Sequence, residues 1–138
     1  MTRVIRTGAG MVVLAAAVFA TACGVGNKEL KEVQRVRSGD LNVVLLSEDG
    51  TLNQGKDAFV IEFRKPDGSL VDVGTVRTSA NMPMPGMTMP ASVQVERSDV
   101  AGRYSANGDF GMVGGWQMKI EWNGPAGQGA VNFEGSVQ

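Results

Sequence analysis

The amino-acid sequence predicts an all-β fold, an immunoglobulin-like β-sandwich of about seven strands. Short runs in which apolar and polar residues alternate indicate strands that each bury one face. The chain contains 19 glycines, many of them in the segments that separate these runs. No strong helical period and no internal repeat is present after residue 40. Short strands joined by glycine-rich turns are typical of a β-sandwich.

Seven segments carry the strand pattern, and the clearest is residues 116–122, where the alternation is unbroken. A Pro-Asp-Gly sequence within residues 65–68 predicts a turn between two of the strands. The expected strands are residues 41–46, 59–63, 71–78, 92–96, 103–105, 116–122 and 131–137. The side chains expected on their buried faces include Phe59, Ile61, Phe63, Trp116, Met118, Ile120, Trp122, Val131, Phe133 and Val137.

Residues 1–22 have the pattern of a secretory signal peptide. Arg3 and Arg6 precede an apolar run that is too short to span a bilayer comfortably, and small residues then precede Cys23. This resembles the bacterial lipobox, in which the cysteine becomes the lipidated N-terminus after cleavage. Gly24 resembles the residue that sends lipoproteins to the periplasmic face of the outer membrane in a double-membrane cell. The alternative is an ordinary signal peptide cleaved near Ala22, which would leave a free thiol.

The predicted organisation is therefore a signal peptide over residues 1–22, a lipidated tether over 23–40 and a β-sandwich domain over 41–138. The tether is polar and compatible with a weak helix over residues 28–37. Cleavage before Cys23 would remove Arg3 and Arg6 and leave 116 residues, with 11 basic and 14 acidic side chains and a net charge of −3. The chain has no basic cluster of the kind that would indicate nucleic-acid binding.

The composition argues against an enzyme. The chain has no histidine, and lipidation of Cys23 would consume its one cysteine. Most acid–base catalysis and most metal ligation in proteins depend on those two residue types. Asp49–Gly50 and Asp67–Gly68 are expected in turns, and no nucleophile–base pair or phosphate-binding loop is present. We therefore expect a binding protein.

Residues 81–90 are the most informative stretch, because Met82, Met84, Met87 and Met89 fall within eight residues. A thioether is soft, uncharged and has no proton to lose, so it favours Cu(I) or Ag(I) over zinc, magnesium or calcium. Three prolines and a glycine interrupt the segment, which excludes a helix or a central strand and predicts a surface loop. The alternative role is an adaptable apolar patch that packs on a partner protein.

The turn within this segment has a predictable geometry. Residues 84–87 fit a type II β-turn, with proline second and glycine third, which brings Met84 close to Met87. If the arms continue as a hairpin, Met82 falls opposite Met89 and all four side chains share a face. The two flanking prolines would then occupy non-hydrogen-bonded positions. Type II turns splay hairpin arms, so the pairing of Met84 with Met87 is the firmer expectation.

Met112 lies in a glycine-rich turn that leads into the strand of Trp116. It can close over the methionine loop as a further sulfur ligand, or it can plug the end of the sandwich. Trp116 can cap a bound cation with its ring face, although a tryptophan in such a strand more often belongs to the core. Met118 is expected in the core because it shares a face with Ile120 and Trp122.

Several segments in the same order resemble the YtkA-like and FixH-like families of membrane-tethered extracytoplasmic domains. They are LNQGKDAF at 52–59, Asp67–Gly68, the Met-x-Met segment, GRY at 102–104 and FGMVGGWQM at 110–118. The resemblance covers about residues 41–137 and implies an immunoglobulin-like sandwich and copper handling, in efflux or in oxidase assembly. By position, Met82, Met84 and Met112 match the methionines of the family best. FixH proper has a transmembrane helix, so a lipid anchor favours efflux or scavenging.

The expected function is that of a lipid-anchored extracytoplasmic protein that binds Cu(I) or Ag(I) as cargo. The metal ligands would come from Met82, Met84, Met87, Met89 and Met112, and the partner would be a copper-efflux or copper-enzyme assembly protein. The alternative is a lipid-anchored interaction module whose methionine segment is an apolar docking patch.

Overall fold

The fold is all-β, as predicted. The structure is a computed structural model, and it describes residues 29–138 of the chain. Residues 29–138 form eight strands rather than about seven, and every pair of strands that are hydrogen-bonded neighbours is antiparallel. Among the described residues, no helix is long and apolar enough to cross a bilayer. The strands are β1 (Lys31–Ser38), β2 (Leu41–Ser47), β3 (Gly55–Arg64), β4 (Thr75–Met84), β5 (Met87–Arg97), β6 (Arg103–Phe110), β7 (Gly114–Gly124) and β8 (Gly127–Val137).

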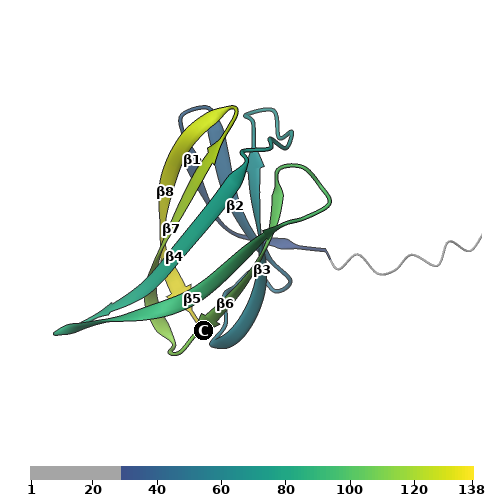
Figure 1. The fold of residues 1–138 in the computed structure, drawn as a ribbon. Helices are drawn as coiled ribbons and strands as arrows, with labels where there is room; N and C mark the ends of the chain where they lie inside the picture. Colours follow the sequence, from purple (N-terminus) through teal and green to yellow (C-terminus); the bar gives the residue numbers. More distant parts are fainter. Residues whose placement is uncertain (1–28) are drawn as a thin grey trace, which may run out of the picture.

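The strands form one sheet in the order β1-β2-β3-β6-β5-β4-β7-β8, which curves until its two ends approach each other (Figure 1). Strands β1 and β8 are in contact, and Leu52 forms an isolated parallel bridge with Val137. The fold is therefore a sandwich that is nearly closed into a barrel. Strand β5 joins the two layers, because residues 87–91 pair with β4 and residues 92–97 pair with β6.

The core lies inside this curved sheet and follows the alternation in the sequence. The side chains expected on the buried faces of β3, β7 and β8 are all buried in one apolar cluster. Two aromatic contacts connect strands that are not paired in the sheet: Phe63 of β3 meets Trp122 of β7 edge-on, with ring centroids 5.3 Å apart, and Phe110 of β6 meets Trp116 of β7. Edge-on aromatic pairs are favourable beyond the apolar area they bury.

The first strand corrects one expectation, since the described part of residues 28–37, which begins at residue 29, contains no weak helix. Residues Lys31–Ser38 form β1, which pairs with β2 and has a bulge between Glu32 and Gln34. Val33 and Val36 pack against the core, and this burial outweighs the helical tendency of the charged residues around them. The sheet thus begins inside the segment expected to be a tether. The proposed signal peptide and Cys23 lie outside the described residues.

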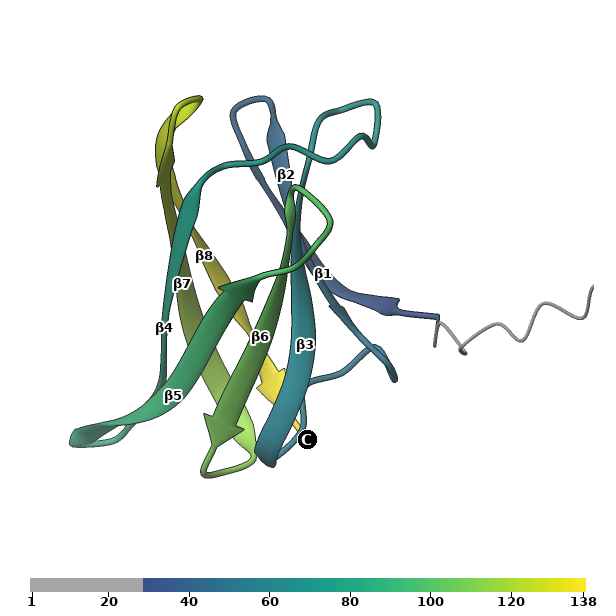
Figure 2. The same cartoon turned by 45° about the vertical axis from the view of Figure 1, so that its right-hand side comes forward.

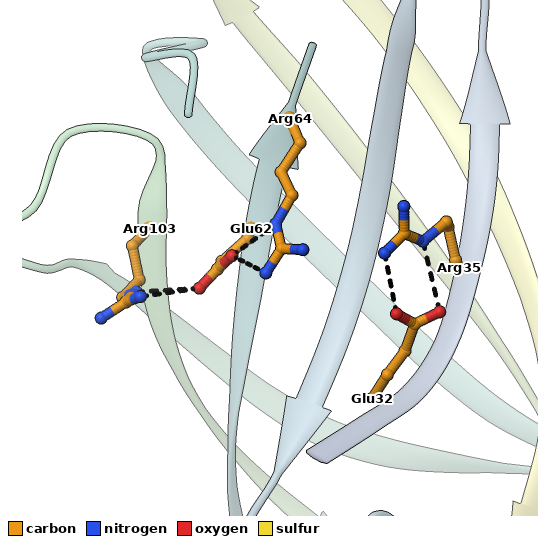
Figure 3. Close-up of polar contacts among 5 residues, drawn as sticks. All are labelled: Glu32, Arg35, Glu62, Arg64 and Arg103. Atoms are coloured by element: carbon orange, nitrogen blue, oxygen red, sulfur yellow. Dashed lines mark hydrogen bonds and ion pairs between the residues drawn. The ribbon is translucent and has the colours of Figure 1, made fainter. Parts of the chain in front are cut away.

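Paired charges from β1, β3 and β6 lie on the outer side of the sheet (Figure 3). Glu62 is only 2% exposed, and it accepts hydrogen bonds from Arg64 Nε at 2.7 Å and Arg103 Nε at 3.0 Å. Arg35 lies across β2 from Glu62 in the strand register and pairs with Glu32 at 2.8 Å. Val44 lies between Arg35 and Glu62 in this register and is fully buried, so β2 is buried on both faces at this point.

The end of the barrel opposite the β6–β7 turn is held by close backbone packing. Tyr104 on β6 donates a hydrogen bond from its hydroxyl to the carbonyl oxygen of Gly74, at 2.7 Å. Gly74 has a φ of +85°, and a Cβ at this position would lie 2.5 Å from the carbonyl oxygen of Asn123. Only glycine satisfies both the left-handed conformation and this approach.

Replacement of Gly74 by alanine is expected to destabilise the domain by about 3 kcal/mol or more, because backbone strain and a clash with fixed backbone add together. The matched control is Gly86→Ala, since Gly86 also has a positive φ of 78° but a Cβ there would meet no heavy atom within 4 Å. The control should lose only about 1–2 kcal/mol. Urea unfolding of both variants measures the difference, and equal losses would show that the packing at Gly74 is not critical.

Candidate metal centre

The methionine segment is a regular hairpin rather than an irregular surface loop. It consists of the end of β4 and the start of β5, with Met84 paired to Met87 and Met82 paired to Met89, as expected if the arms continued as a hairpin. Gly86 has a φ of 78°, which suits the third position of a type II turn after Pro85. The pairing continues to Ala80 and Ala91, so the expected splaying of the arms does not disrupt the register.

The two flanking prolines explain where this hairpin leaves the sheet. The pair next to a two-residue turn is hydrogen-bonded and the following pair is not, so Pro83 and Pro90 occupy non-hydrogen-bonded positions within the hairpin. An N–H at these positions would point outward, toward β7 or β6, and proline has none. Pairing of β4 with β7 accordingly ends at Asn81, and pairing of β5 with β6 begins at Ser92. Beyond those points the hairpin projects as a free two-stranded ribbon (Figures 1 and 2).

The register places the four methionines on one face of this ribbon. Hydrogen-bonded partners have Cα atoms about 5.5 Å apart, and residues two apart on a strand are separated by about 7 Å. The Cα atoms of Met82, Met84, Met87 and Met89 therefore occupy the corners of a small rectangle. Methionine has three rotatable bonds beyond Cα, so several thioethers can converge above it.

Exposure of these side chains increases from the base of the ribbon to its tip. Met82 is 4% exposed and belongs to the core cluster, whereas Met87 at the turn is 57% exposed. Met84 and Met89 are half-buried, and Met89 packs against the core. The inner pair is therefore held by packing, and the outer pair is accessible to an incoming ion.

The β6–β7 turn lies against the base of the ribbon. Met89 Sδ is 3.6 Å from the position that a Cβ on Gly111 would occupy, and Gln54 Nε2 donates a hydrogen bond to the carbonyl oxygen of Gly111 at 3.1 Å. Met112, the next residue, is 39% exposed and therefore does not plug the end of the sandwich. The turn that carries Met112 thus neighbours the sulfur of Met89.

Trp116 and Met118 are core residues. Both are buried on β7, and Met118 pairs with Ala80 of β4. The last pair of this register is Asn81 with Gln117, so Trp116 and Met82 each lie one residue beyond it. The Trp116 ring is tilted against Phe110 with centroids 6.1 Å apart, and its buried Nε1 has no hydrogen-bond acceptor among the described residues. The prediction that Met118 belongs to the core is confirmed, and Trp116 belongs to the same core cluster.

The described residues contain no cluster of three or more histidine, cysteine, aspartate or glutamate side chains that could hold a metal. The acidic residues expected in turns are in turns. Hydrogen bonds from Asn53 and from the backbone of Thr51 lower the pKa of Asp49 to about 2. The side chain and backbone N–H of Ser69 likewise lower the pKa of Asp67. Residues 81–91 contain no carboxylate, and thioethers are the soft donors of the ribbon.

Comparison with known proteins identifies the family. The YtkA-like family model matches residues 35–121, more than half of the chain, so the protein belongs to the YtkA-like family. Among solved structures, it is similar to a copper-bound variant of FetP from uropathogenic Escherichia coli, with a TM-score of 0.50. That alignment covers 79% of this chain and 97% of the FetP chain at 10% identity, so the likeness concerns the fold. No curated protein sequence matches the chain.

Proposed function

We propose that this protein is a membrane-anchored extracytoplasmic Cu(I)- or Ag(I)-binding protein that buffers or relays the ion. The ligands are thioethers drawn from Met82, Met84, Met87, Met89 and Met112. The observation that carries this proposal is the hairpin register, which puts two methionine pairs on one face and Met89 Sδ beside the turn of Met112.

The chemistry of the donor set supports a soft monovalent cargo. Thioether sulfur is neutral and polarisable, so it suits Cu(I) and Ag(I), whereas Cu(II) and zinc prefer nitrogen or anionic ligands. Neutral donors hold Cu(I) less tightly than thiolates, which suits an ion that must be released. Membership of the YtkA-like family, and the copper-bound state of the FetP variant that shares the fold, point in the same direction.

A second candidate function is protein docking through an apolar patch. Met87 at the tip of the ribbon, and Met112 and Val113 in the β6–β7 turn, are large apolar side chains that stay exposed. Methionine-rich surfaces adapt to different partners. Leucine keeps the apolar area and removes the soft donor, so leucine variants separate the two functions.

Replacement of Met82, Met84, Met87 and Met89 together by leucine is expected to weaken Cu(I) binding by more than about 100-fold, because hydrocarbon replaces every donor of the ribbon. The measurement is a titration of the mature protein with Cu(I) against a competing chelator. Met118→Leu is the matched control, since it makes the same replacement in the core, where such a swap is tolerated. An unchanged affinity in the quadruple variant would leave the docking function as the better explanation.

Binding of Cu(I) is expected to be nearly independent of pH between about pH 5.5 and 7.5, because a thioether loses no proton when it binds a metal. The chain contains no histidine to titrate in that range. The same competition titration, repeated across the range with a chelator of known pH dependence, tests this. An affinity that rises about tenfold per pH unit would indicate a ligand that must be deprotonated, and hence a different site.

Anchoring through Cys23 is a separate part of the proposal. Intact-mass analysis of the protein extracted from membranes with detergent should give a chain that begins at Cys23 and carries acyl chains. A mature chain that begins at Cys23 or Gly24 without acyl groups would show that residues 1–22 act as an ordinary signal peptide and that the protein has no lipid anchor at Cys23.

A further inference from the structure

The methionines of the described residues differ widely in their access to solvent. Met82 and Met118 are buried in the core, whereas Met87 at the tip of the ribbon is 57% exposed and Met112 is the next most accessible. A small oxidant in solution meets an exposed thioether before a buried one and converts it to a sulfoxide. Met87 is therefore the methionine of this domain that is most open to oxidation.

The side chain of Met87 also lies outside the packing that holds the fold together. Its strand pairs only with β4 at this point, because pairing of β5 with β6 begins at Ser92. Met84 and Met87 are not part of the core cluster, whereas Met82 belongs to it and Met89 packs against it. A sulfoxide oxygen at Met87 can remain in water, so it leaves no buried polar group without a partner. The same oxygen at Met82 would enter the apolar core.

Oxidation changes the kind of donor as well as the polarity of the side chain. The sulfur shares a lone pair with the new oxygen, and that oxygen is a hard donor, which Cu(I) and Ag(I) bind poorly. Residues 81–91 contain no cysteine, histidine or carboxylate that could take the place of the lost thioether. Loss of one sulfur at the tip therefore weakens the donor set of the ribbon directly.

We propose that Met87 is an oxidation site that controls metal binding: a peroxide converts it to the sulfoxide, and the ribbon then releases its monovalent ion while the domain stays folded. This inference rests on the proposed function, because it gives Met87 a share in holding the ion. Reduction of the sulfoxide would restore the site.

The oxidation step transfers one oxygen atom and two electrons. The sulfur lone pair attacks one oxygen of hydrogen peroxide, and the S–O bond forms as the O–O bond breaks. The other oxygen leaves as hydroxide and takes the proton from the transferred oxygen, which gives water. Sulfur is thus oxidised by two electrons and the peroxide is reduced by two. An ion bound to Met87 occupies the attacking lone pair, so a loaded chain should react more slowly at this residue.

The test treats the metal-free mature protein with hydrogen peroxide until about one oxygen per chain has been added, and peptide mass spectrometry then locates the oxygen. Met87 should be oxidised at least about fivefold faster than Met84 or Met89 and faster than Met112, and Met118 serves as the buried control. Prior loading with Ag(I), which peroxide does not oxidise, should slow the reaction at Met87.

The chain oxidised at Met87 is then purified and titrated with Ag(I) against a competing ligand. Its affinity should be about tenfold or more below that of the untreated protein, and its urea midpoint should be unchanged. Met112→Leu removes the other exposed thioether, and peroxide should still weaken Ag(I) binding in this variant. In Met87→Leu the same treatment should cause little loss beyond that of the substitution itself.

The outcomes separate this inference from the proposed function. Normal Ag(I) binding that is unchanged after oxidation of Met87 would refute control by Met87 and leave the proposed function intact. Faster oxidation of Met112 than of Met87, or a lower urea midpoint in the chain oxidised at Met87, would also refute it. If the untreated chain binds neither Cu(I) nor Ag(I), the proposed function fails and the control of binding fails with it.

Discussion

The arrangement of the candidate site depends on two missing backbone N–H groups. Pro83 and Pro90 lie where an N–H would continue the ladders to β7 and β6, so both ladders stop and the hairpin continues alone. Had these ladders continued, the four methionines would lie on an ordinary wall of the barrel, where their side chains would fill the core. The prolines thus separate a sulfur-bearing ribbon from a β-sheet whose other strands use methionine only as a core residue.

The base of the ribbon remains tied to the core, which limits how far its sulfurs can spread. Met82 is buried in the apolar cluster beside the β7 strand, and Met89 Sδ rests on Gly111. Gln54 donates a hydrogen bond to the carbonyl oxygen of Gly111, and Phe110 and Trp116, which flank the turn in sequence, are in ring contact. The inner methionines, Met82 and Met89, are held by packing, whereas the outer methionines, Met84 and Met87, are more accessible to an ion from solvent. This combination suits a site that must both retain and release an ion.

Much of the fold could be predicted from the sequence because burial on one face leaves a period-two pattern. The clearest case is β7, where the alternation from Trp116 to Trp122 is unbroken and every expected inward side chain is buried. Strand β1 could not be predicted in this way. Its residues are mostly polar and charged, and it is a strand because β2 offers an edge to pair with and the core accepts Val33 and Val36. The burial of Glu62 could not be predicted either, because its two arginine partners come from β3 and β6.

The sequence by itself determined which side chains the candidate site contains and the pairing of Met84 with Met87 across the turn. Four thioethers around a Pro-Gly turn can form only a few local geometries, and the turn alone sets Met84 against Met87. Tertiary structure decided which sulfurs are buried, where the ribbon leaves the sheet and which distant turn lies beside it. The approach of Gly111 to Met89 depends on the sheet order, in which β5 lies between β4 and β6. Local patterns encode turns and faces, whereas contacts between distant segments depend on how the whole sheet closes.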